Sequence, residues 1–149
     1  MISRIFVDAN VPIYAAGRDH PLKGPCGEVM ALAAEFTDAF FTDAEVVQEL
    51  LHRYLALRLW PQGRDVVERF VAIMRGHVES IHLADVEDAT QAAEGHMRRS
   101  ARDLLHLSVM KRVGARHIVS ADRDFDSVPG LVRFDPANNS TWRANLSNQ

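Results

Sequence analysis

The amino-acid sequence predicts an α/β domain with a central parallel sheet of four or five strands. Short runs of β-branched or aromatic residues alternate with longer stretches whose apolar residues recur at helical spacing, and this alternation is typical of parallel sheets. The length of 149 residues suits about one domain, and 47% apolar and 25% charged residues are ordinary globular proportions. We expect one domain over residues 1–136, with residues 137–149 as its polar C-terminal tail.

Five runs are predicted to be strands because each is short, apolar and bounded by turn-forming residues. In chain order they are Ile5–Val7, Ala39–Phe41, Val78–Leu83, His117–Val119 and Leu131–Phe134. Polar residues follow four of them directly. Asp8 follows the first, Thr42 and Asp43 follow the second, Ser120 begins the polar segment after the fourth, and Asp135 follows the fifth.

Five intervening stretches are predicted to be helices because their apolar residues recur at helical spacing. They are Gly27–Glu35, Asp43–Leu59, Arg64–Arg75, Asp85–Arg98 and Ala101–Val113. The second opens with the sequence TDAE, a capping-box pattern in which Thr42 would cap the helix and Glu45 would bond back to it. It is expected to end before Pro61, and the fifth helix before Gly114.

Composition disfavours several classes of protein. The single cysteine, Cys26, cannot form an intramolecular disulfide, so nothing requires an oxidising compartment. The start of the chain lacks the apolar core of a signal peptide, and no apolar stretch approaches the ~18 residues of a membrane helix, so we expect a cytoplasmic protein. The net charge of −3 argues against a simple non-specific nucleic-acid binder. The seven histidines lack zinc-ligand spacing, and most are expected at the surface or in satisfied positions.

Acidic residues stand where the carboxyl ends of two predicted strands would lie. Asp8 follows the first strand, whereas Asp122 and Asp124 follow the fourth. Ligands of parallel α/β sheets bind at the carboxyl ends of the strands, so these acids would meet if both strands are central. Clustered carboxylates repel one another, and hard cations such as Mg²⁺ and Mn²⁺ take oxygen ligands. A metal site is therefore the interpretation that explains such a cluster best.

Each of these acids also has a structural interpretation. Asp8 could form a turn after its strand by bonding its own backbone, and Asn10 fits the same turn. The DRDFD segment that begins at Asp122 could be a solvated acidic turn. A calcium loop is rejected there, because its required glycine and glutamate positions hold Ser127 and Arg133.

Two further acids lie on predicted helices. Asp103 stands in the first turn of the fifth helix, where Ser100 could be the N-cap, so a role in capping and a role as a metal ligand are both open. Glu49 lies just beside the buried stripe of the second helix. Taken alone, Glu49 is better explained as an exposed pair with Arg53 four residues on, worth about 0.2–0.5 kcal/mol.

Four short motifs together resemble the PIN-domain family, and within it the VapC toxins of bacterial toxin–antitoxin pairs. The motifs are IFVDANVPIYA at Asp8, VVQELLHR at Glu49, ARDLLHLSVMKRVGARHIVSADRDF and VPGLVRFDP. The resemblance runs from about Ile5 to Pro136, and four motifs in register are much more specific than any one of them. It implies a three-layer α/β/α PIN-like nuclease domain.

The activity that the resemblance implies is that of a Mg²⁺- or Mn²⁺-dependent endoribonuclease, the toxin of a VapBC-type module. Four acids match the acidic positions of the family and one matches a frequent fifth: in order, Asp8, Glu49, Asp103, Asp122 and Asp124. Asn10 matches a polar position beside the metal site, and Ser120 keeps the hydroxyl where many relatives have threonine. We assign Glu49 to the attacking water and the other four acids to the metal.

The resemblance also implies a homodimer and a cognate VapB-like antitoxin that covers the active-site groove and offers a basic side chain to the acids. Apolar residues that could line this groove, with an ordinary core position as the alternative for each, are Val11, Ile13, Tyr14, Leu55 and Leu59. With the five site acids set aside, the rest of the chain is net positive. Arginines that could guide RNA phosphates, with a solvated face as the alternative, are Arg53, Arg58, Arg64, Arg98, Arg99 and Arg102.

Two other functions match parts of this pattern. A haloacid-dehalogenase-like phosphatase also places an acid after its first strand, but its general acid would stand at Asn10, which cannot protonate a leaving group. A catalytically inactive PIN-like module that binds RNA or protein has no need to hold like charges together. Cleavage of RNA phosphodiester bonds is therefore the activity that we expect.

Overall fold

The computed structural model describes residues 4–95 and 98–146, and it confirms the α/β class with a parallel five-stranded sheet. The spatial order of the strands is β3-β2-β1-β4-β5, and every neighbouring pair is parallel. The strands are β1 (Ile5–Val7), β2 (Phe40–Asp43), β3 (Val78–Glu79), β4 (His117–Val119) and β5 (Val132–Phe134). All five runs predicted from the sequence contain a strand, although the third is much shorter than the predicted Val78–Leu83.

Strand β1 lies at the centre of the sheet because the chain first builds outward on one side of it and then on the other. Ile5 pairs with Phe40 of β2 on one side and with His117 of β4 on the other. The order of the strands therefore reverses between β1 and β4, where a crevice forms at the carboxyl ends of an open α/β sheet. Asp8 and Ser120, which follow these two strands, lie at that crevice.

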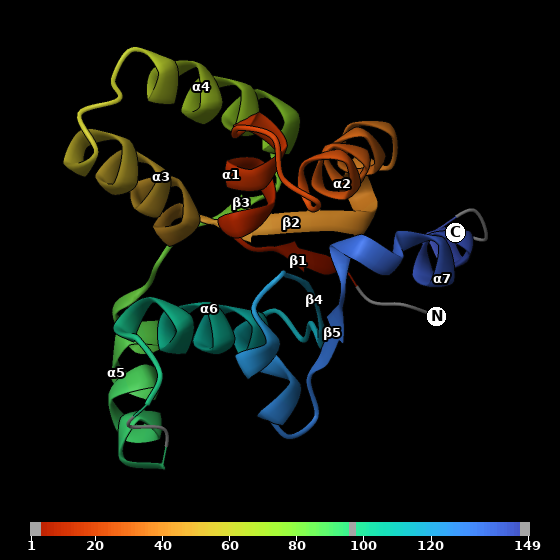
Figure 1. Ribbon diagram of the computed structural model, residues 1–149. Helices are drawn as coiled ribbons and strands as arrows, with labels where there is room; N and C mark the ends of the chain where they lie inside the picture. Colours follow the sequence, from red (N-terminus) through yellow and green to blue (C-terminus); the bar gives the residue numbers. More distant parts are fainter. Residues whose placement is uncertain (1–3, 96–97, 147–149) are drawn as a thin grey trace.

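Helices cover both faces of the sheet and give three layers (Figure 1). Helices α1, α2 and α4 lie on one face and α5 and α6 on the other, while α3 leaves the end of β2 and packs along α4. The helices are α1 (Asn10–Ala16), α2 (Lys23–Glu35), α3 (Ala44–Ala56), α4 (Gln62–Met74), α5 (Leu83–Ala92), α6 (Ala101–Arg112) and α7 (Asn139–Trp142). Within the described ranges, no helix combines the length and hydropathy needed to cross a bilayer.

Two helices differ from the sequence-based prediction because each has a proline near its start, which the prediction took as a break. Helix α1 was not predicted, and α2 begins at Lys23 instead of Gly27. Pro12 and Pro25 lie in the first turns of these helices, where the missing N–H of proline leaves no hydrogen bond unmade. Helix α1 starts two residues after Asp8. The segment from Asp8 to Asn10, which could have been a turn, therefore leads directly into a helix at the crevice.

The N-cap of α3 is Asp43, so the capping box predicted for Thr42 and Glu45 is wrong. The Asp43 Oδ1 atom accepts a hydrogen bond from the Val46 amide at 2.9 Å. The Thr42 hydroxyl instead donates to the Val7 carbonyl of β1 at 2.9 Å. Thr42 thus links β1 and β2 through a side-chain hydrogen bond. The second oxygen of the buried Asp43 carboxylate takes no part in the cap and is available for a contact in the core.

The ends of two predicted segments also differ. Helix α5 ends at Ala92 and is followed by a short 3₁₀ turn, and residues 96–97 of the predicted helix 85–98 lie outside the described residues. The polar tail is less loose than its composition suggests as far as it is described. Trp142 is buried and stacks on Phe134 of β5 with ring centroids 5.1 Å apart, and Leu146 is also buried. Residues 147–149 of the tail lie outside the described part of the chain.

Candidate active site

A small cavity of about 280 Å³ opens at the carboxyl ends of β1 and β4. Four of the five predicted site acids line it, and they come from four different segments of the chain: the ends of β1 and β4 and the helices α3 and α6. The lining residues are Asp8, Asn10, Ile13, Tyr14, Glu49, Arg53, Asp103 and Asp122. The structure therefore brings together Asp8, Glu49, Asp103 and Asp122, which are scattered in the sequence.

Asp8 is almost fully buried and is held by hydrogen bonds on both carboxylate oxygens. Oδ1 accepts from the Ala9 amide at 2.8 Å, the local turn bond that the structural interpretation expected. Oδ2 accepts from the Ser120 hydroxyl at 2.7 Å and from Asn10 Nδ2 at 3.1 Å. Burial raises the pKa of Asp8 because it penalises the charged form, while these hydrogen bonds and the nearby His106 oppose the rise.

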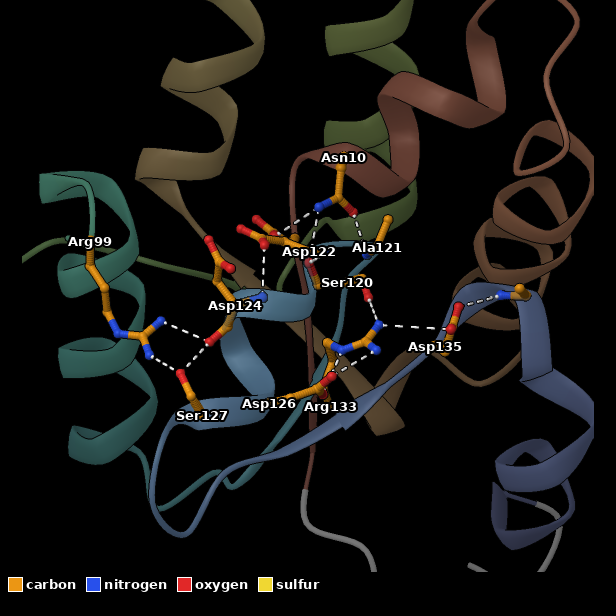
Figure 2. Close-up of polar contacts among 12 residues, drawn as sticks. Asn10, Arg99, Ser120, Ala121, Asp122, Asp124, Asp126, Ser127, Arg133 and Asp135 are labelled. Carbon is orange, nitrogen blue, oxygen red and sulfur yellow. Dashed lines mark hydrogen bonds and ion pairs between the residues drawn. The ribbon is translucent and has the colours of Figure 1, made fainter. Parts of the chain in front are cut away.

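Ser120 and Asn10 join the ends of β1 and β4 into one network (Figure 2). Asn10 Nδ2 donates to the Ser120 hydroxyl at 2.9 Å, and its Oδ1 accepts from the Ala121 amide at 3.0 Å. The Asp122 amide donates to Ser120 Oγ at 3.0 Å. The orientation of Asp8 and the start of the acidic turn are therefore fixed by the same two side chains, in keeping with the supporting roles that the sequence predicted for them.

The acidic turn is a 3₁₀ helix, Arg123–Ser127, which Asp122 caps by accepting the Asp124 amide at 2.9 Å. Asp122 lines the cavity, whereas the Asp124 side chain is exposed and lies outside the lining. Asp124 thus lies at the rim of the cavity, two residues after Asp122 in the acidic turn.

Two arginines hold this turn in place from outside (Figure 2). Arg99 donates to the Asp124 carbonyl at 3.1 Å and to Ser127 Oγ at 2.8 Å. Arg133 of β5 forms a bidentate pair with Asp126 at 2.8 and 3.1 Å and also donates to the Ser120 carbonyl at 2.9 Å. The guanidinium of Arg99, which was predicted to guide RNA, is therefore engaged in fixing the turn.

Asp103 stands in the first turn of α6, and its side chain reaches the cavity. Its amide donates to Ser100 Oγ at 3.1 Å, so Ser100 is the N-cap of α6, as predicted. Its carboxylate meanwhile lines the cavity. Burial raises the pKa of Asp103, as do the neighbouring charges of Asp122 and Glu49, whereas His106 and Ser100 oppose the rise.

Glu49 faces the cavity from α3 and is about one-quarter exposed. Its Oε1 atom lies 3.6 Å from Arg102 Nη1, and its Oε2 atom lies 3.9 Å from His106 Nε2. Glu49 thus forms its ion pair with Arg102 of α6, across the crevice. The position of its side chain does not depend on the pairing with Arg53 that was expected within α3. Arg53 lies on the cavity wall as well.

His106 is the site residue that the sequence analysis missed. It has no exposed surface, and its Nδ1 atom lies 2.7 Å from Asp43 Oδ2. Donor atoms of Asp8, Glu49 and His106 all lie within 4.8 Å of one another. The spacing of Asp103 and His106 by three residues, one helical turn, is the signal that could have placed both on one face of α6.

The pKa of His106 is raised although its ring is buried. Burial alone would lower this pKa, but the hydrogen bond to Asp43 and the nearby carboxylates of Glu49 and Asp8 outweigh burial and raise the pKa to about 10. Two basic side chains, His106 and Arg102, lie beside Glu49 and offset part of the charge of the acid cluster.

The side chains around the cavity match the requirements of a hard divalent cation. The cavity offers carboxylate oxygens from four acids, and a ring nitrogen of His106 lies within 4.8 Å of the ligand atoms of Asp8 and Glu49. Carboxylate oxygens suit hard cations such as Mg²⁺ or Mn²⁺. Burial raises the pKa of Asp8 and of Asp103, and a bound cation would favour their charged forms.

Comparison with known proteins gives a consistent result. The profile of the PIN domain family matches residues 5–131. Ribonuclease VapC13 of Mycobacterium tuberculosis is 36% identical over 130 residues, which cover 87% of this chain and 98% of that protein. Ribonuclease VapC23 of the same organism is 38% identical over 126 residues, covering 83% and 96%. The crystal structure of VapBC2 from Rickettsia felis, bound to a promoter DNA fragment, aligns with a TM-score of 0.69 at 15% identity, covering 91% of this chain and 98% of that one.

Proposed function

Because the chain belongs to the PIN-domain family, we propose that it is a metal-dependent endoribonuclease, the toxin of a VapBC-type toxin–antitoxin module. The observation that carries this proposal is the convergence of Asp8, Glu49, Asp103 and Asp122 on one cavity at the switch point of the sheet. The names of the curated relatives support ribonuclease activity. Their similarity extends over nearly their whole length, and the match to the PIN-domain profile over residues 5–131 includes every segment that contributes an acid.

We assign different roles in phosphodiester hydrolysis to different residues of the site. Asp8, Asp103 and Asp122 would hold a Mg²⁺ or Mn²⁺ ion, and Asp124 can join them from the rim. A bound divalent ion neutralises phosphate charge and lowers the pKa of water. Asn10 and Ser120 hold the Asp8 carboxylate in one orientation through the bonds to Oδ2. Glu49 lies on a different helix from the metal ligands, and we assign it to orienting the attacking water and accepting its proton.

A cleavage assay with metal control tests this function. Purified protein incubated with RNA and Mn²⁺ is expected to produce discrete cleavage products, and a chelator is expected to stop the reaction until Mn²⁺ is restored in excess. Gel analysis of the products measures both steps. RNA that is bound but never cut would identify an inactive binding module instead.

Two arginines are placed to contact the RNA backbone. Arg53 lines the cavity, and the Arg102 side chain is partly exposed beside Glu49. Arg64, in contrast, pairs with Glu68 on the exposed face of α4 at 2.8 Å. We therefore assign phosphate binding to Arg53 and Arg102, and not to the whole set of arginines that the sequence suggested.

We expect RNA binding to weaken steeply with added salt, because each arginine bound to a phosphate displaces counterions. Arg53→Gln should lower RNA affinity and reduce the slope of log Kd against log salt by about one. The matched variant Arg64→Gln should leave that slope unchanged. Fluorescence anisotropy with labelled RNA, in an Asp8→Asn background that prevents cleavage, measures both. A flat salt response in the parent protein would contradict the assignment.

We further propose a VapB-like antitoxin as the partner that covers the active-site groove. Three leucines on and just beyond α3 are about half exposed: Leu51, Leu55 and Leu59. Ile13 and Tyr14 extend this apolar surface into the cavity, whereas Val11 is fully buried, so the core alternative given for it holds. The similar fold of VapBC2 supports such a partner. The cleavage assay repeated with a co-purified, neighbour-encoded protein should show inhibition.

We also propose that the protein is a homodimer and that it is cytoplasmic.

A further inference from the structure

His106 lies beneath the cavity with its two ring nitrogens directed at two different carboxylates. Nδ1 is 2.7 Å from Asp43 Oδ2, and Nε2 is 3.9 Å from Glu49 Oε2. Within residues 4–95 and 98–146, Nε2 is the one fully buried side-chain polar atom that lacks a hydrogen-bond partner. A buried polar atom without a partner is costly and calls for an explanation.

The orientation of the ring is set by Asp43, which is itself fixed. Asp43 is the last residue of β2 and the N-cap of α3, where its Oδ1 accepts the Val46 amide. Its Oδ2 can only accept, so His106 Nδ1 carries a proton. The Phe6 ring packs against the imidazole, with centroids 5.1 Å apart. Held in this way, the ring places Nε2 3.9 Å from Glu49 Oε2, and a ring nitrogen also lies within 4.8 Å of an Asp8 carboxylate oxygen.

We propose that His106 is a positioning residue that holds the Glu49 carboxylate at the cavity wall, with Asp43 as its anchor. The proposal rests on the proposed function for the role of Glu49 at the attacking water. A merely space-filling role would be served by an apolar side chain, which would leave no polar atom unpaired.

The Glu49 carboxylate is surrounded by like charges, and the contact with His106 opposes their repulsion. Asp8 and Asp103 both repel the Glu49 carboxylate, and Arg102, which faces its other oxygen, is over one-third exposed and therefore screened by solvent. The buried His106 is not screened in this way. Loss of His106 should allow Glu49 to swing away from the acids and toward solvent.

Two substitutions separate positioning from packing. Asparagine at position 106 reaches only toward Asp43, whereas the longer glutamine reaches toward Glu49. We expect His106→Asn to lower kcat for RNA cleavage about tenfold or more with little change in KM, and His106→Gln to retain more of kcat. A loss of kcat that follows only the melting temperatures of the two variants would overturn the proposal.

A double-mutant cycle in metal-free protein tests the contact without any cleavage assay. The four proteins are the parent, His106→Asn, Glu49→Gln and the double variant, and the readout is the melting temperature. We expect His106→Asn to lower the melting temperature by about 5 °C in the parent and by less than half of that in the Glu49→Gln background. Equal losses in both backgrounds would show that His106 does not act on Glu49.

A measurement on the unmodified ring covers the case in which His106→Asn does not fold. Histidine-ring ¹⁵N resonances of the parent and of Glu49→Gln are compared without metal. The Nε2 resonance should move and the Nδ1 resonance should stay, because Asp43 is untouched; an unmoved Nε2 resonance would overturn the proposal. Cleavage by the parent protein tests the proposed function separately, so a failure of either can be told from a failure of the other.

Discussion

Replacing Asp8 with asparagine is expected to abolish metal-dependent RNA cleavage without lowering the melting temperature. Asp8 is the most buried of the four acids in the cavity, and its burial raises its pKa, so the charged form is held at a cost to stability. The amide removes that charge and keeps one oxygen for the local bond to Ala9.

The measurement for Asp8→Asn is the rate of RNA cleavage with saturating Mn²⁺, beside a thermal melt without metal. Asp38→Asn is the matched control, because the Asp38 side chain is almost completely exposed and Asp38 does not line the cavity. The control should cleave like the parent. Cleavage that survives in Asp8→Asn would remove Asp8 from the mechanism, and a clear drop in its melting temperature would mean that the residue is needed for folding.

Replacing Glu49 with glutamine is expected to lower kcat by about 10²–10⁴ while metal binding is largely kept. This is the usual contribution of a general base, and Glu49 is separated from the other acids by standing on α3. Mn²⁺ should still raise the melting temperature of Glu49→Gln, because a ligand that binds only the folded state stabilises it.

The comparison variant for Glu49→Gln is Asp122→Asn, which should lose both cleavage and most of the Mn²⁺-dependent rise in melting temperature. The two variants thus separate a residue that acts on water from one that binds the ion. If the rise disappears in Glu49→Gln as well, Glu49 is itself a metal ligand and the assignment made above is wrong.

The part of the site that could be predicted depends on the ends of strands. Asp8 and Asp122 follow apolar runs that could hardly be anything but buried strands, and parallel strands direct their carboxyl ends to the same edge. The N-cap role of Ser100, and with it the position of Asp103 in the first turn of α6, also follows from local sequence. These inferences need only neighbouring residues and the general geometry of parallel sheets.

The part that could not be predicted depends on how helices face one another. Glu49 seemed to be a surface residue when only its own helix was considered, and its partners Arg102 and His106 both come from α6. From the sequence, Asp43 was only the first residue of a predicted helix, although its carboxylate also contacts His106. Periodicity within one helix shows which face is buried, but it does not show which residues of another helix that face meets.

The central position of β1 has a consequence for how the protein is made. Asp8 is synthesised near the beginning of the chain, but its partner Ser120 follows 112 residues later, and β4 cannot pair with β1 until the ribosome has produced it. Asp103 and Asp122 also belong to the last third of the chain. A nascent chain that lacks this segment therefore has no complete set of acids, and nuclease activity can arise only after β4 and Asp122 have been synthesised.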